Sequence, residues 1–241
     1  MLIFFIIGLL VGSFLNVVIY RVPRGESIIW PGSHCTKCGH ELKPTDLVPV
    51  LSYLLLRGKC RYCREQITIR YPLVELLTAF TFYLIYLKSG LTVGTAAGCV
   101  LTSILIVAAF TDIDEGIIPD VITYPGMVLG LTFSFFTIGA KMSFAGMLAF
   151  GIVFLLIAVL SHGGMGGGDV KLVAAIGAFV GLKGALLAFI ISSLAGGIWA
   201  AGLLILGKAG RKTELRFGPF LSLAGCLTYM YGPELLRLYF A

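Results

Sequence analysis

The chain has 241 residues, of which 58% are hydrophobic and only 12% are charged, and its formal net charge is +6. Soluble domains carry about 25% charged residues, and the mean hydropathy of this chain is +0.99. These values exclude an ordinary soluble domain and predict an all-α polytopic membrane protein, because apolar stretches long enough to cross a bilayer recur along the sequence.

The first predicted membrane span is Leu2–Tyr20, which carries no charge before Arg21. No cleavage site of small residues follows it, so we interpret it as a retained helix and not as a signal peptide. Small or polar residues recur on it every four positions, at Gly8, Gly12 and Asn16. This spacing favours close packing of the helix against another one.

Residues 21–70 form the long polar segment, which is rich in Pro, Gly, Lys and Arg. It is too short for a large core of its own. Its apolar piece, Leu47–Leu56, is about half as long as a membrane span and predicts an interfacial or buried element.

The polar segment contains two Cys-x2-Cys motifs separated by 21 residues, formed by Cys35, Cys38, Cys60 and Cys63. This spacing is typical of a structural zinc site with four thiolate ligands. Disulfides are the alternative, and the reducing cytosol disfavours them. In so short a segment, bound zinc would supply folding free energy that a small core cannot. The two other cysteines lie inside apolar runs, where we expect inert packing.

Seven further spans bring the predicted total to about eight transmembrane helices. They are approximately Tyr71–Leu87, Leu91–Phe110, Val121–Ala140, Met142–Leu160, Val170–Val180, Ala185–Leu206 and Pro219–Phe240. We therefore divide the chain into a first transmembrane helix (1–20), a zinc-binding loop domain (21–70) and a transmembrane core (71–241). An even number of spans places both termini on one side.

Lys and Arg predict the orientation, since positive charges gather on the cytosolic side. The loops after spans 1, 3, 5 and 7 hold Arg21, Arg24, Lys37, Lys43, Arg57, Lys59, Arg61, Arg64, Arg70, Lys171, Lys208, Arg211, Lys212 and Arg216, against Lys88, Lys141, Lys183 and Arg237 on the other side. The cysteine loop is therefore expected in the cytosol.

Two acidic segments at the predicted cytosolic helix ends are candidate catalytic sites. The first is Thr111–Asp120, with its carboxylates at Asp112, Asp114, Glu115 and Asp120. The second is Asp169, which follows the glycines Gly166, Gly167 and Gly168. Ionisable groups beside membrane segments are costly and usually functional, and the glycines would let a peptide backbone approach Asp169.

Two neighbouring carboxylic acids cannot both ionise at low cost, so one keeps a proton while the other takes one from the water that attacks a carbonyl. This is the chemistry of an aspartic protease. The residues alone do not separate Asp112 from Asp114. Glu115 and Asp120 are interpreted as surface residues, with Asp120 suited to cap the next helix.

Six segments resemble, in sequence and in order, the motifs of the type IV prepilin peptidase family, the bifunctional leader peptidases and N-methyltransferases of bacterial pilus and type II secretion systems. They are GSFLNVVIYRVP (Gly12–Pro23), the paired CxxC loop, RYPLVELLTA (Arg70–Ala79), DIDEGIIPD (Asp112–Asp120), GMGGGDVKL (Gly164–Leu172) and FGPFL (Phe217–Leu221).

This resemblance implies that Asp112 and Asp169 are the catalytic acids, because relatives with one Asp keep six residues between it and the proline, as Asp112 does here. It implies supporting roles for Asp114, Gly166, Gly168 and Lys171. The implied substrate is a prepilin or pseudopilin whose short basic leader is cut after a glycine on the cytosolic side of the bacterial inner membrane.

The resemblance also links the cysteine loop to a second reaction, in which the new α-amino group receives a methyl group from S-adenosylmethionine. Gly58 and Lys59 stand where the family has residues linked to methylation. The chain has no glycine-rich Rossmann signature for the methyl donor. The basic groups of the loop suit anionic membrane lipids, and they do not form the aromatic-interleaved face expected for nucleic acid.

Two rival functions predict different observations. A proton-coupled transporter predicts internal repeats and acids near the bilayer midplane, whereas no repeat is evident and the acids lie near one surface. A non-catalytic assembly protein that docks a cytosolic partner through its zinc loop predicts a dispensable acid pair.

Overall fold

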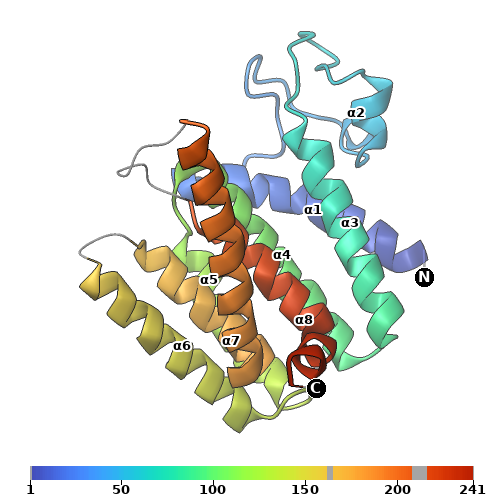
Figure 1. Cartoon of the computed structure of the whole chain (residues 1–241). Helices are drawn as coiled ribbons and strands as arrows, with labels where there is room; N and C mark the ends of the chain where they lie inside the picture. The colour runs from blue at the N-terminus through green and yellow to red at the C-terminus, as the bar shows by residue number, and fades with distance from the viewer. Residues whose placement is uncertain (1, 162–164, 208–215, 241) are drawn as a thin grey trace. The chain divides into compact units, whose positions relative to one another are not determined.

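The computed structural model describes residues 2–161, 165–207 and 216–240, with the side chains of residues 238–240 left aside. Its helices are α1 (Leu2–Arg21), η1 (Val22–Arg24), η2 (Pro44–Asp46), α2 (Leu51–Leu55), α3 (Arg70–Ser89), α4 (Val93–Glu115), α5 (Asp120–Ser134), α6 (Ala140–Leu160), α7 (Gly167–Ile205) and α8 (Gly218–Phe240) (Figure 1). The described part holds no strand beyond single bridges at His34–Glu41 and Lys59–Gln66. Lys208, Arg211 and Lys212, used above for orientation, lie outside the described residues.

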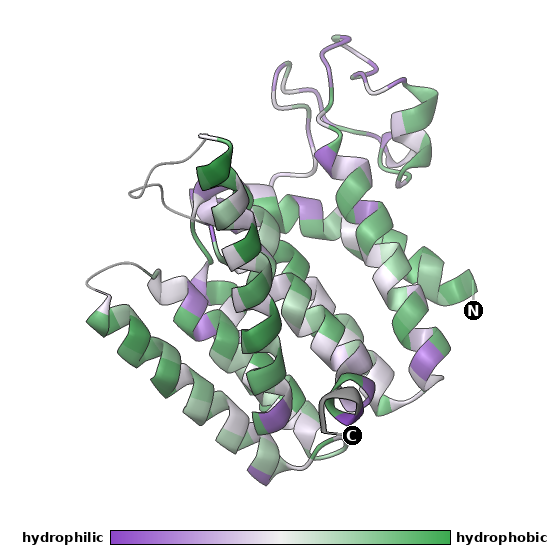
Figure 2. Ribbon diagram, in the orientation of Figure 1, coloured by the Kyte–Doolittle hydropathy of each residue, from purple (hydrophilic) through white to green (hydrophobic). Residues whose placement is uncertain are grey.

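Four helices are long and apolar enough to cross a membrane: Leu2–Arg24, Val93–Glu115, Ala140–Leu160 and Gly167–Ile205. Apolar residues dominate these helices, while polar residues concentrate in the cysteine loop (Figure 2). The all-α polytopic membrane fold is therefore confirmed.

The predicted spans correspond to helices with shifted ends. The α4 helix continues through Asp112 to Glu115, so the acids lie on its last turn and not in a loop after it. The α5 helix ends at Ser134, six residues before the predicted end at Ala140, where α6 already begins. Predicted Leu47–Leu56 contains only the single turn of α2.

The α7 helix contains both predicted spans of its region, separated at Gly181. That residue has φ 70° and ψ −174°, which interrupts the helix. Figure 1 shows the chain changing direction sharply within α7, so that its two arms are separate rods. The left-handed φ explains why a glycine stands there.

By its contacts the chain forms two compact units, Met1–Gly90 and Leu91–Ala241. The first contains the antiparallel pair α1 and α3 together with the cysteine loop. A Cβ atom on Gly8 would lie 2.5 Å from the Ala79 Cα, and one on Gly12 would lie 2.7 Å from the Glu75 Cα. The stripe of small residues on α1 is thus the surface on which α3 packs, as predicted.

The second unit packs α5, α6 and α8 against α7, while α4 packs mainly against α8 and α5. Its core includes Leu101, Leu105, Phe154, Leu172, Ile176 and Leu221, each at most 2% exposed. The α6 and α7 helices approach closely because Gly146 and Gly177 face each other, where a Cβ atom on either would lie within 2.7 Å of the opposite backbone. This packing fixes the start of α7 and hence the position of Asp169.

Candidate functional site

Asp112 is buried on the last turn of α4, where it is 7% exposed. Its Oδ2 accepts a hydrogen bond of 3.0 Å from the backbone N–H of Gly218, the first residue of α8. Its carbonyl oxygen accepts from the Gly116 N–H at 3.0 Å and from Arg216 Nη1 at 2.9 Å. The side chain and backbone of Asp112 are therefore both held, largely by a segment more than 100 residues further along the chain.

Gly218 fits beside Asp112 because it has no side chain. A Cβ atom there would lie 2.8 Å from the Asp112 Oδ2 and 3.0 Å from its Cγ. We had not singled out Arg216 and Gly218 as site residues from the sequence. The available signal was the FGPFL segment, which follows Arg216 directly and begins one residue before Gly218.

Asp169 lies on the first turn of α7, whose N-cap is Gly166. Its Oδ1 is buried and accepts no hydrogen bond from any described residue. The residue before it, Gly168, packs against Ile118 in the segment that follows α4. Folding therefore brings the two carboxylates that the sequence singled out into one place, where the end of α4 meets the start of α7.

The glycines before Asp169 differ in what surrounds them. A Cβ atom on Gly168 would lie 2.9 Å from the Ile118 Cβ, so Gly168 is needed for packing against the segment after α4. A Cβ atom on Gly166 would lie 3.4 Å from the Asp169 Oδ2, and one on Gly167 would meet nothing within 4 Å. We expected all three glycines to leave room for an approaching peptide backbone. Of the three, only Gly167 borders open space.

Asp120 and Lys171 join the two acidic motifs. The Lys171 Nζ lies 2.6 Å and 2.7 Å from the two carboxylate oxygens of Asp120, and 5.2 Å from the centre of the Tyr124 ring. The N-cap of α5 is Pro119 and no side chain caps it, so our expectation that Asp120 caps this helix was wrong. Asp114 and Glu115 are both exposed.

The four loop cysteines converge as their spacing predicts. The Sγ atoms of Cys35, Cys38, Cys60 and Cys63 all lie within 4.8 Å of one another, and none of them is in a disulfide. The Sγ atoms of Cys35 and Cys63 are 3.8 Å apart. Zn–S bonds of about 2.3 Å in a tetrahedron give sulfur–sulfur edges of about 3.8 Å, so these residues fit a zinc ion.

Each cysteine pair sits on a tight turn that orients the thiols. The Gly39 N–H donates to the Cys35 carbonyl at 2.8 Å, and the Arg64 N–H donates to the Cys60 carbonyl at 3.0 Å. The Asp46 carboxylate accepts from Arg61 Nε at 2.6 Å, which ties η2 to the second turn. Although burial acts to raise it, the bond from Arg61 holds the pKa of Asp46 below its usual value.

Gly58 and Lys59 immediately precede the third cysteine. Gly58 is buried with φ 67°, and a Cβ atom on it would lie 3.0 Å from the Tyr53 Oη. The Gly58 carbonyl accepts from the Ile67 N–H at 2.7 Å. Lys59 is exposed. Only a glycine suits the first position, whereas the second presents a cation to solvent.

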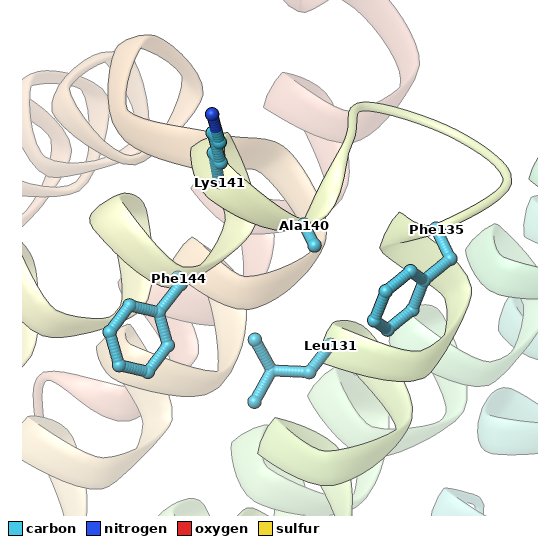
Figure 3. A pocket seen from close by; sticks show the side chains of 5 residues that line it. All are labelled: Leu131, Phe135, Ala140, Lys141 and Phe144. Carbon is cyan, nitrogen blue, oxygen red and sulfur yellow. The ribbon is translucent and has the colours of Figure 1, made fainter.

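One hollow in the second unit has a lining that includes neither Asp112 nor Asp169. It has a volume of about 440 Å³ and is lined by Leu131, Phe135, Ala140, Lys141 and Phe144, at the end of α5 and the start of α6 (Figure 3). Its lining is almost wholly apolar, and Lys141 is the one ionisable residue among those that line it.

The fold and the paired carboxylates define a polytopic membrane protein with an acid pair at two helix ends and a four-thiolate loop. Residues 6–89 match the model of the bacterial peptidase A24 N-terminal domain, and residues 99–201 match that of the type IV leader peptidase family. The chain belongs to this family.

The sequence similarity to known relatives extends over most of the chain. A prepilin leader peptidase/N-methyltransferase of Bacillus subtilis is 36% identical over 98% of this chain and 96% of its own length. A protein of the same name from Pseudomonas aeruginosa is 36% identical, covering 97% and 91%. One from Myxococcus xanthus is 39% identical over 87% of this chain and 65% of its own length. Comparison with solved structures gave no significant match.

Proposed function

We propose that this protein is a membrane aspartic endopeptidase that removes the leader of prepilins or pseudopilins and then N-methylates the new terminus. The relatives are named for both activities. The observation that carries the peptidase half is the position of Asp112 at the end of α4 and Asp169 at the start of α7, where Gly168 packs against Ile118. Neither the transporter nor the assembly protein is favoured by the family match.

The two acids divide the work of peptide hydrolysis. One carboxylic acid donates a hydrogen bond to the scissile carbonyl oxygen, while the other carboxylate takes a proton from water. The water oxygen then forms a bond to the carbonyl carbon, the carbon–nitrogen bond breaks, and a proton passes to the leaving amine. The bonds to Asp112 from Gly218 and Arg216 fix its geometry for this step.

The peptidase role is tested by cleavage of a prepilin with purified enzyme in nanodiscs. We expect Asp112→Asn and Asp169→Asn each to lower the cleavage rate by about 100-fold or more, the usual contribution of an acid–base group. Glu115→Gln is the matched control, because it removes an exposed acid three residues away. Normal cleavage by either of the first two variants would refute the assignment.

The methyltransferase half is assigned to the cysteine loop, with a structural zinc ion held by the four cysteines. The fit of the sulfur positions supports zinc. S-adenosylmethionine would supply the methyl group to the α-amino nitrogen freed by cleavage. Gly58 and Lys59 are proposed to serve this reaction, Gly58 through the turn it permits and Lys59 through its exposed cation.

The protein is proposed to lie in the bacterial inner membrane with its acids and its cysteine loop on the cytosolic side. The Lys and Arg distribution supports this orientation. The loop domain (21–70) would serve methylation and the core (71–241) would serve cleavage. Prepilins of pilus or type II secretion systems would be the substrates, and anionic lipids would contact the basic loop.

A further inference from the structure

Two charged side chains at the ends of α1 and α3 are buried, and neither belongs to the proposed sites. Arg21 is 6% exposed and Glu75 is 7% exposed. Burying a charge is costly unless it is well paired by hydrogen bonds, and a charge in a membrane helix usually serves a function. Their partners indicate what that function is.

Arg21 binds the first arm of the cysteine loop through three backbone carbonyls. Its Nη1 donates to the oxygens of Ser27 at 3.0 Å and Pro31 at 2.7 Å, and its Nη2 donates to that of Gly32 at 3.0 Å. These residues lead directly into the turn that carries Cys35. A planar guanidinium with several fixed donors is suited to hold a loop in this way.

Glu75 binds the second arm through one backbone N–H. Its carboxylate accepts a bond of 2.7 Å from Val50 and a further one from the hydroxyl of Ser13 on α1. Val50 has φ 62° and ψ −48°, a positive-φ conformation that is an outlier for a β-branched residue. Such a backbone persists only where its surroundings hold it, and Glu75 provides that hold.

A chain of contacts connects Glu75, through Val50 and α2, to the residues linked to methylation. Val50 is the N-cap of α2, whose Tyr53 packs against Gly58 at a distance that only a glycine allows. Lys59 and Cys60 follow directly. A displacement of Val50 would therefore move the Gly58–Lys59 pair, although it touches no cysteine ligand.

We propose that Arg21 and Glu75 form a clasp that positions the cysteine loop on the α1–α3 pair for methyl transfer. Both act as positioning residues, through the loop backbone. This rests on the proposed methyltransferase function of the loop. The clasp lies wholly within the first unit, so its loss should spare cleavage by the acids of the second unit.

The test uses the full-length enzyme with its metal, a prepilin and S-adenosylmethionine, with cleavage and methylation measured together by mass spectrometry. A misplacement of about 1 Å can cost about 100-fold in rate. We expect Glu75→Leu to lower methylation by about 10- to 100-fold, with cleavage and zinc content near those of wild type. Glu75→Gln keeps an acceptor oxygen and should retain most of the methylation.

Four further variants separate positioning from general loss of structure. Val50→Gly adopts a positive φ without strain, so in the Glu75→Leu background it should restore part of the methylation. Arg21→Lys keeps donors and should be milder than Arg21→Met. Glu65→Leu is the control, because it removes an exposed loop carboxylate whose closest ion-pair contact is 4.0 Å.

Amide hydrogen exchange provides a readout independent of activity. The Val50 N–H should exchange faster in Glu75→Leu and remain protected in Glu75→Gln. Wild-type methylation by Glu75→Leu would overturn the proposal, as would loss of methylation in Glu75→Gln with Val50 still protected. An equal loss of cleavage and methylation would overturn it too. A wild-type enzyme that cleaves without methylating would instead refute the proposed methyltransferase function, while the exchange result would still test the clasp.

Discussion

Asp112 illustrates how a single side chain is set by groups distant in the sequence. It accepts a hydrogen bond from the Gly218 N–H, and the same glycine would collide with it if it carried a methyl group. The absence of a side chain at Gly218 is therefore as important to the acid pair as the presence of a carboxylate.

We predict that Gly218→Ala lowers the rate of prepilin cleavage by about 10-fold or more, because displacing an acid by a fraction of an ångström misaligns it with the carbonyl. Methylation of a peptide supplied already cleaved should be unchanged. Gly197→Ala is the control, since a Cβ atom there meets nothing within 4 Å. Unaltered cleavage by Gly218→Ala would show that this contact does not position Asp112.

The Asp120–Lys171 ion pair is partly exposed, with side chains 55% and 32% accessible. Pairs of this kind contribute about 0–1 kcal/mol to stability. We predict that Lys171→Met changes the thermal midpoint by little but lowers cleavage several-fold, because Lys171 lies two residues from Asp169 and ties it to α5. The exchanged pair, Asp120→Lys with Lys171→Asp, should recover part of this loss, and a failure to recover any would argue against the pairing.

At the scale of elements, close helix packing decides where the acids stand. The first arm of α7 packs closely on α6 because Gly177 lies against Gly146, and Gly181 ends this arm by interrupting the helix. The site is therefore a consequence of glycine positions well away from the acids themselves.

We predict that Gly146→Leu destabilises the protein by about 1–3 kcal/mol, the usual cost of overpacking a tight interface. The thermal midpoint in detergent should fall accordingly. The matched control is Gly151→Leu on the same helix, where a Cβ atom would make only an ordinary contact of 3.4 Å with Ala174. Equal midpoints for the two variants would contradict the close α6–α7 approach.

At the scale of the whole molecule, the two units carry different chemistry. The cysteine cluster lies in the first and the acid pair in the second.

We predict that removing the metal with a chelator, or replacing Cys35 with Ser, abolishes methylation while leaving cleavage within about twofold. Thiolates hold structural zinc, and its loss removes folding free energy from the loop alone. Metal content and both activities measured on one sample would decide this. Retention of metal and methylation by Cys35→Ser would refute the zinc site.

The sequence was sufficient for features that depend on local spacing. Composition predicted the membrane fold, the Cys-x2-Cys motifs predicted the cluster, and the stripe at Gly8 and Gly12 predicted close packing of α1 against another helix. Helical periodicity determines which residues of the stripe share one face, and a short turn brings the two cysteines of each motif together.

Tertiary structure alone decided the rest. The pairing of Asp120 with Lys171, the contact of Gly218 with Asp112 and the burial of Arg21 and Glu75 by the loop backbone all join residues separated by loops of irregular length. No periodicity relates such partners, because their distance depends on how the helices pack. The sequence therefore determined which chemical groups are present, and the packing determined which of them meet.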